Sequence, residues 1–289
     1  MKKTISLLLI IVIVTFFYPD KVFAVAPTDY VSCFNYNEAS AGVGAVTRID
    51  SNTTNSNDLT DNNTTPSATG LVGDAIDPEN ANTEYLSITD ATQSGLGFTG
   101  DFSWSMWIKP ESQPASTDQM GLVGKWATDD GAYIMTIWNN AGTYRVRTNL
   151  YDDGAPSTNV PVNFTTNLGT GVWKHLVWTV DVGATDSVGE LWVNGTSVGS
   201  GTYTGVNAIN LSSGILGIGG GYEGLLWQTS FDGLRDVEEM YNRVLTGAEI
   251  TQLYNSGAGV DCSGRGVVTT TPIIHMQGDI QLQGDAIIQ

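Results

Sequence analysis

The sequence has few basic residues, and this shortage argues against one large class of partner. The 289 residues include 12 Lys and Arg against 30 Asp and Glu, which gives a formal net charge of −18 at pH 7. Proteins that bind nucleic acid neutralise backbone phosphates with clustered Lys and Arg. The composition therefore excludes nucleic acid as the default partner.

Cysteine and histidine are also scarce. Two Cys, Cys33 and Cys262, are too few for a thiolate metal cluster or for a small scaffold held by several disulfides. Two His, His175 and His275, are too few for a metal site built from several histidines of one chain. The alternatives for the cysteines are one disulfide or two free thiols.

Long hydrophobic runs are absent after the N-terminal segment. Two lysines precede a nearly unbroken apolar stretch over 5–18, and the short side chains around Ala24 suit signal peptidase. The alternative, a membrane anchor, needs roughly 20 apolar residues, and this stretch has about 14. We predict a signal peptide over 1–24, a secreted or cell-surface location, and no membrane span after cleavage.

Export favours a disulfide between the two cysteines, because thiols of exported proteins meet an oxidising compartment. A bridge between Cys33 and Cys262 requires Cα atoms within roughly 7 Å of each other. We therefore expect the two ends of the mature chain to lie side by side.

Most of the mature chain has the pattern of β-strands. Short runs rich in aromatic and β-branched residues recur between Gly, Asp, Asn and Ser. In residues 102–108 one face reads Phe, Trp, Met, Ile and the other reads Ser, Ser, Trp. This pattern favours strands over helices and predicts an all-β antiparallel sandwich or barrel. Asn194-Gly195 predicts a two-residue hairpin loop. Residues 51–69, rich in Asn, Thr and Ser, predict turns and loops without a packed face.

One short helix is expected near the C-terminus. Thr246 and Glu249 have the spacing of a capping box. Ile250, Leu253 and Tyr254 then share one helical face, and we predict that Gly257 ends the helix.

The last residues differ in composition from the rest. A Thr-Thr-Thr-Pro stretch over 269–272 indicates a linker, and residues 277–282 and 283–288 form a near-repeat that begins Gln-Gly-Asp. We predict a linker and short repeat tail over 263–289. The two copies form a lone strand or hairpin, or pair with the edge of a partner, and the alternative is a weakly ordered tail.

Five segments in order resemble the LamG-like jellyroll family of the concanavalin A-like lectin/glucanase superfamily. They are residues 84–88, 100–110, 173–181, 191–195 and 231–254. The resemblance implies an antiparallel β-sandwich jelly roll with one short C-terminal helix over 25–262. One departure is that Val237 and Glu238 are exchanged relative to the family pattern. Either a bulge re-aims this strand or Glu238 faces a polar pocket.

The sequence lacks a recognisable catalytic pattern. Glycosidases that resemble this family carry Glu-x-Asp-x-Glu on one strand, which this chain does not have, and Glu238 and Glu239 are neighbours that point to opposite faces. His175 stands where the family has a strand histidine, which favours packing over catalysis. We therefore expect no enzyme, and a glycoside hydrolase stays the less favoured alternative.

Aromatic residues beside loops are the candidate ligand contacts, with core packing as the alternative for each. They are Trp126, Tyr133, Trp138, Tyr151, Tyr222 and Trp227. We assign the other tryptophans of the middle region, Trp104, Trp107, Trp173, Trp178 and Trp192, to sheet packing.

Calcium is the cofactor that the resemblance suggests, because several relatives bind Ca²⁺ through loop oxygens. Loop carboxylates are present at Asp129, Asp130, Asp152, Asp153, Asp181 and Asp186, without a ligand spacing that assigns the site. We predict an exported, non-catalytic recognition or adhesion module that binds a glycan or a cell-surface protein through sandwich loops. The alternative is a structural or assembly component of an extracellular surface.

Overall fold

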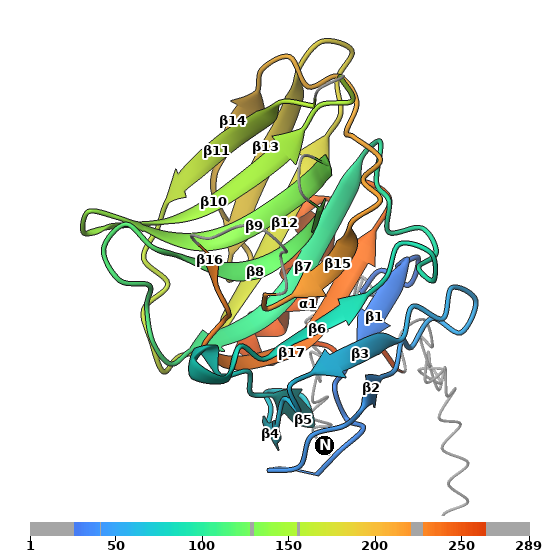
Figure 1. The fold of residues 1–289 in the computed structure, drawn as a ribbon, viewed down its shortest axis with the longest axis vertical. Coiled ribbons are helices and arrows are strands. Elements are labelled where there is room, and N and C mark those ends of the chain that lie inside the picture. The colour runs from blue at the N-terminus through green and yellow to red at the C-terminus, as the bar shows by residue number, and fades with distance from the viewer. Residues whose placement is uncertain (1–25, 41, 128–129, 155–156, 221–227, 264–289) are drawn as a thin grey trace, which may run out of the picture.

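Two β-sheets pack face to face in the computed structural model, which describes residues 26–263 except 41, 128–129, 155–156 and 221–227 (Figure 1). The predicted signal peptide, Tyr222, Trp227 and nearly all of the predicted tail lie outside the described residues. The boundaries 25–262 therefore stay a prediction. No helix in the part of the chain that the structure describes has the length and hydropathy needed to cross a membrane.

The first sheet has eight strands. In spatial order they are β14 (Thr196–Tyr203), β13 (Ser187–Val193), β12 (Lys174–Asp181), β7 (Phe102–Pro110), β17 (Gly233–Tyr241), β5 (Asp74–Ile76) and β4 (Ser67–Thr69), with β1 (Ser32–Phe34) also paired to β17. Every pairing in this sheet is antiparallel.

The second sheet has nine strands. In spatial order they are β11 (Asn159–Thr165), β10 (Thr143–Tyr151), β9 (Asp130–Asn140), β8 (Gln119–Ala127), β15 (Ile215–Ile218), β6 (Tyr85–Ile88), β3 (Leu59–Asn62) and β2 (Thr47–Arg48), with β16 (Gln228–Thr229) parallel to β8. The helical segments are η1 (Asn80–Asn82), α1 (Gly247–Tyr254) and η2 (Asn255–Gly257). The predicted all-β antiparallel sandwich with one short C-terminal helix is confirmed.

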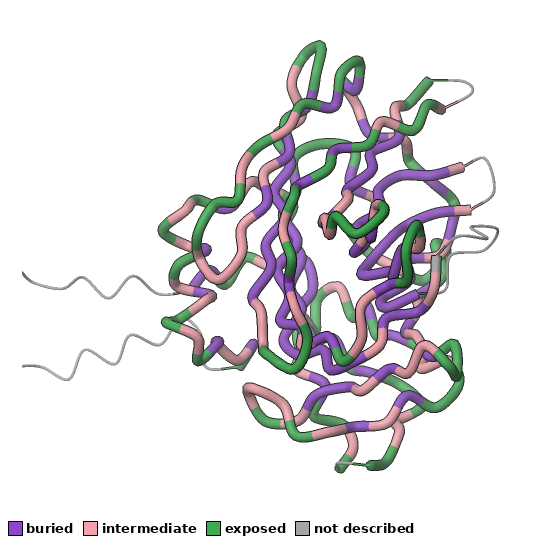
Figure 2. The backbone as a smooth tube through the Cα atoms, turned by 90° about the vertical axis from the view of Figure 1, so that its left-hand side faces the viewer, coloured by how far each residue is buried: buried purple, intermediate pink, exposed green. Residues whose placement is uncertain are grey.

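Alternating apolar residues from both sheets form the core. Trp104 and Trp178 are fully buried in it, and the Trp178 ring meets Phe102 edge to face with centroids 5.0 Å apart. Figure 2 shows that buried residues concentrate in the stacked strands, whereas exposed residues gather in the loops. Trp107, Trp173 and Trp192 pack against smaller apolar clusters, as predicted.

Two local features that the sequence predicted, a hairpin loop and a helix cap, are present in the structure. Asn194 and Gly195 both have positive φ, and they join β13 to β14. Thr246 and Glu249 form the reciprocal capping box of α1, which buries Ile250 and Leu253. The predicted helix end is wrong by two residues, because Asn255 rather than Gly257 takes the left-handed conformation directly after Tyr254. The Asn255 side chain stabilises this turn by donating to Gly259 O at 2.9 Å.

Residues 51–69 contain more regular structure than predicted. They include β3 and β4, and Asn57 is fully buried among polar partners. Its amide donates to Ser32 Oγ and Ser94 O, both at 2.8 Å, and accepts from Ser94 N. The expectation of an unpacked loop is therefore wrong, because side-chain amides here replace an apolar face.

The strand β17 contains the bulge that the exchanged Val237 and Glu238 suggested. The register against β7 shifts between Asp236 and Glu238, and Val237 has a φ of 33°. Both predicted alternatives occur together, because Glu238 is also fully buried and accepts from Arg235 Nε at 2.6 Å. The bulge thus turns a carboxylate toward a buried guanidinium.

The two ends of the described chain meet at the first sheet. Cys33 on β1 and Cys262 after η2 form a disulfide with Cα atoms 5.9 Å apart. The Cys262 N–H also donates to Asn35 Oδ1 at 3.0 Å. The predicted disulfide is confirmed.

Candidate ligand-binding face

The second sheet presents an aromatic and basic outer face on β9 and β10. Ile137 and Val146 point into the core, so alternation places Trp138, Arg145 and Arg147 on the opposite side. Trp138 and Arg145 are direct register partners. The guanidinium carbons of Arg145 and Arg147 lie 5.4 and 5.0 Å from the Trp138 ring centroid, and all three side chains are partly exposed.

A second aromatic group lies on the same face, further along the strands. Trp126 on β8, Ile134 on β9 and Tyr151 on β10 pack together. Gly131 permits this contact, because a Cβ atom there would lie 2.6 Å from atoms of both the Trp126 and the Tyr151 rings. Trp126 and Tyr151 keep small exposed fractions, 8% and 9%.

Amide and hydroxyl groups occupy positions between and beside these rings. Asn149 donates to Asn159 Oδ1 at 2.7 Å, and Thr136 donates to Gln119 Oε1 at 2.9 Å. Asn163 is exposed and is the register partner of Arg147. Asn149 and Thr136 are buried and support the face from within, whereas Asn163, Trp138 and the two arginines keep accessible surface. The accessible groups combine apolar ring surface with hydrogen-bond donors and acceptors, which is the chemistry that binds sugars.

The structure brings together three of the six predicted aromatic contacts. Trp126, Trp138 and Tyr151 share the outer face. Tyr133 is a correction: it lies fully buried in the core, where its hydroxyl donates to Leu96 O at 2.8 Å and burial raises its pKa. It points to the core because it stands one residue away from Ile134 on the same strand.

Sequence reasoning did not select Arg145 and Arg147, although the signal was present. They alternate with Val146 and Thr148 on a predicted strand, so they had to share its outer face. Their juxtaposition with Trp138 depends on the pairing of β9 with β10, which the sequence does not state.

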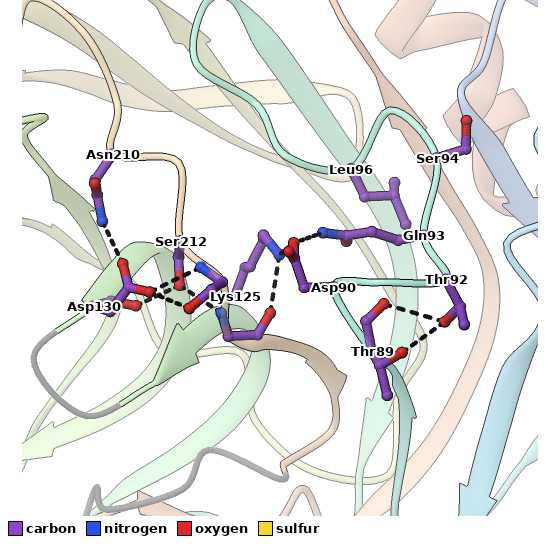
Figure 3. Close-up of polar contacts among 12 residues, drawn as sticks. Thr89, Asp90, Thr92, Gln93, Ser94, Leu96, Lys125, Asp130, Asn210 and Ser212 are labelled. Carbon is purple, nitrogen blue, oxygen red and sulfur yellow. Dashed lines mark hydrogen bonds and ion pairs between the residues drawn. The ribbon is translucent and has the colours of Figure 1, made fainter.

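The loops beside this face are tied to the sheet by buried charge (Figure 3). Lys125 is buried on β8 and donates to Asp90 Oδ1 at 2.6 Å and to Gly214 O at 2.9 Å. Burial lowers the pKa of Lys125, and its ammonium lowers the pKa of Asp90. Asp130 accepts from Asn210 and Ser213, so this carboxylate fixes the loop before β15.

Among the described residues, the loop carboxylates considered for Ca²⁺ form no group of three within ligand distance. Asp130, Asp152 and Asp186 each accept hydrogen bonds within separate loops. Asp129 lies outside the described residues. The grouping of carboxylates that the described residues do form is a different one: Asp77, Glu79 and Glu111, with one oxygen of each within 4.8 Å of the others.

The carboxylates of this second group repel one another and their acidic neighbours. Burial raises the pKa of Asp77, and the charges of Glu111, Glu84 and Asp232 raise it further. Burial and the neighbouring Asp232 raise the pKa of Glu79. Carboxylate oxygens are the ligands that Ca²⁺ takes, so Asp77, Glu79 and Glu111 have the chemistry of a partial Ca²⁺ site.

A buried pair of side chains resembles nucleophile and base but lies out of reach of substrate. Ser105 Oγ and His175 Nε2 are 2.9 Å apart, and both residues are at most 1% exposed. The His175 ring packs beside Trp107 and Tyr254, with centroids 5.0 and 6.2 Å away. A nucleophile must contact its substrate, so this pair serves packing, as predicted for His175.

Comparison with known proteins adds a family and a set of similar folds. A family model described as the Concanavalin A-like lectin/glucanases superfamily matches residues 80–251. No curated protein sequence matches the chain.

Three solved structures illustrate the fold. Domain 4 of AbnA, a GH43 extracellular arabinanase from Geobacillus stearothermophilus in complex with arabinotriose, has a TM-score of 0.54 and 18% identity, over 77% of this chain and 97% of that one. The botulinum neurotoxin serotype D/C binding domain has a TM-score of 0.60 and 11% identity, over 79% and 52%. The binding domain of Paraclostridial Mosquitocidal Protein 1 has a TM-score of 0.57 and 14% identity, over 79% and 52%. This chain therefore spans about half of each toxin domain. The TM-scores show a shared fold, and at such low identities the similarity shows the fold alone.

Proposed function

Because this chain belongs to the concanavalin A-like lectin/glucanases superfamily, we propose that it is an exported, non-catalytic module that recognises a glycan. The observation that carries this proposal is the outer face of β8–β11, where Trp126, Trp138 and Tyr151 lie among amides. The similar structures are compatible with it, since AbnA domain 4 is in complex with arabinotriose. A cell-surface protein is the alternative partner, as one similar toxin binding domain is in complex with rat synaptotagmin II.

An extracellular location and a Ca²⁺ ion are part of the same proposal. The disulfide between Cys33 and Cys262 supports an oxidising location. Asp77, Glu79 and Glu111 are the residues that would hold the ion. We assign the ion a stabilising role, because it would neutralise carboxylates that otherwise repel one another.

A glycan array probed with the purified protein tests the proposed function. We expect binding to a restricted set of glycans and a loss of about tenfold or more in affinity for Trp138→Ala, because a central aromatic contact carries a large share of binding energy. Tyr144→Ala is the matched control, since Tyr144 is an aromatic on the neighbouring strand β10, on the other face of the sheet. It should leave binding unchanged.

Two results would contradict the proposal. One is an array without bound glycans, and the other is an equal loss for Trp138→Ala and Tyr144→Ala. Bound oligosaccharides are also incubated with the protein and analysed for cleavage, because carboxylates do converge at Asp77, Glu79 and Glu111. Cleavage products would show that the protein is a glycoside hydrolase.

A further inference from the structure

Arg145 and Arg147 are cations that form no ion pair with the described residues of a strongly acidic protein. The described Arg48, Lys125, Arg235 and Arg243 each form an ion pair. Neither Arg145 nor Arg147 does so with any described residue, and their Nε atoms are buried without a hydrogen-bond partner. Since the chain has 30 Asp and Glu, the absence of a carboxylate from this pair is a specific feature of the face.

The arrangement of the two guanidinium groups is costly in the free protein. Arg145 and Arg147 are two residues apart on β10, so their Cα atoms are about 7 Å apart along the strand and their charges repel. The Arg147 side chain is partly buried, so its charge is partly removed from water, and this burial lowers its pKa. The Trp138 ring offsets part of this cost by cation–π contact and holds both groups in place.

An anionic group bound between the two cations would remove this repulsion. Guanidinium groups donate in a planar fork that matches the two oxygens of a carboxylate. Asn163, exposed and opposite Arg147, and Thr165, exposed and opposite Arg145, stand where sugar hydroxyls could bond. The face therefore combines a site for an oxyanion with sites for neutral sugar groups.

The overall charge limits how acidic the ligand can be. A net charge of −18 repels a dense polyanion such as nucleic acid or a heavily sulfated polysaccharide. Two guanidinium groups that no described carboxylate neutralises suit a ligand with an isolated negative charge in an otherwise neutral chain.

We propose that Arg145 and Arg147, held by Trp138, bind the carboxylate of an acidic sugar within a sparsely charged glycan. This inference rests on the proposed glycan-binding function and names its ligand class. The outer face of the second sheet would then prefer acidic sugars over neutral ones.

Calorimetric titration with two matched pairs of sugars tests the inference. The pairs are xylotetraose with and without one 4-O-methylglucuronic acid branch, and lactose with and without a terminal sialic acid. We expect at least one acidic member to bind about tenfold more tightly than its neutral counterpart, because its carboxylate gains charge-assisted bonds. Raising NaCl from about 50 to 500 mM should reduce this preference, since exposed charge pairs are screened.

Variants separate the role of the arginines from general folding. Arg145→Gln with Arg147→Gln should reduce the preference for the acidic member to about twofold or less. Arg145→Lys with Arg147→Lys keeps the charges but loses the planar forks, so it should retain an intermediate preference. Lys174→Gln is the matched control, because Lys174 is a cation on the first sheet without an ion pair to described residues. It should leave the preference unchanged.

Four outcomes overturn the inference. The first is equal binding of acidic and neutral members, and the second is a preference that survives the double Gln substitution in a protein with an unchanged melting temperature. The third is no binding of any of the four sugars, since the guanidinium pair then adds no affinity for a carboxylate. The fourth is tighter binding of heparin than of both acidic sugars, which would show that the arginines bind sulfate esters and not the carboxylate of a sparsely charged glycan. The glycan array decides separately whether the proposed function stands.

Discussion

At the scale of single residues, Asp236 links stability to pH. Its carboxylate is fully buried and accepts N–H groups of Leu71, Val72 and Val237, all at 2.8 Å. Burial outweighs these bonds and raises the pKa from 3.8 to about 7. Between these values the folded state holds a proton that the unfolded state has lost. The free energy of unfolding therefore falls as pH rises through this window.

Urea unfolding at intervals between pH 4.5 and 7.5 measures this effect. Each pH unit in the window should change the free energy of unfolding by up to about 1.4 kcal/mol from this one group. Asp236→Asn lowers the overall stability, because its amide cannot accept from all three N–H groups, but it should flatten the pH dependence. Exposed Asp153→Asn is the control. Equal slopes for the wild type and Asp236→Asn would contradict the assignment.

Single residues also show where prediction from sequence stops. Alternation identified the anomaly at Glu238, but it could not distinguish a bulge from a polar pocket, because the buried partner Arg235 becomes visible only when β17 bends. Trp138 was identified, whereas the adjacent Arg145 was not. The contact between them depends on strand pairing, and pairing is a long-range property.

At the scale of secondary-structure elements, the sequence was sufficient to predict features that depend on residues close together in the chain. The hairpin at Asn194-Gly195 and the capping box of α1 each depend on a few consecutive residues, and both are present. The strands β3 and β4 were missed because their sequences lack an apolar face. Buried polar contacts such as those of Asn57 hold this region, and the sequence does not reveal which donors and acceptors will meet.

The ends of strands bring Asp77, Glu79 and Glu111 together, so removing one of these like charges should stabilise the fold. Asp77 directly follows β5, and Glu111 directly follows β7. Glu111→Gln removes one of the like charges and no described hydrogen bond of that side chain, so it should raise the free energy of unfolding by about 0.5–1 kcal/mol in EDTA at pH 7.

The same denaturation measurement tests the Ca²⁺ ion. Millimolar CaCl₂ should raise the melting temperature of the wild type more than that of Glu111→Gln, because the variant has lost one candidate ligand. Asp153→Asn controls for general screening of acidic charge. An equal response of all three proteins to CaCl₂ would show that no ion binds at this group.

At the scale of the whole molecule, the fold closes on itself at the first sheet. The strand β1 pairs with β17, and Cys33 and Cys262 then join positions 229 residues apart in the sequence. Val237 of the bulge and Trp107 pack against this bridge. Sequence reasoning could predict this closure because export, two cysteines and their terminal positions all indicated one cross-link.

Removing the bridge should therefore destabilise the protein without altering the outer face of the second sheet. In the chain-entropy model a loop of this length contributes about 5 kcal/mol as an upper value, because the bridge restricts the unfolded chain. Cys33→Ala with Cys262→Ala should lower the free energy of unfolding by up to that amount. Wild type unfolded in reducing agent should match the double variant. Glycan affinity at temperatures where the variant stays folded should be unchanged, since Trp138 lies on the second sheet. Unchanged stability of the double variant would mean that β1 and the segment around Cys262 hold the closure without the covalent bond.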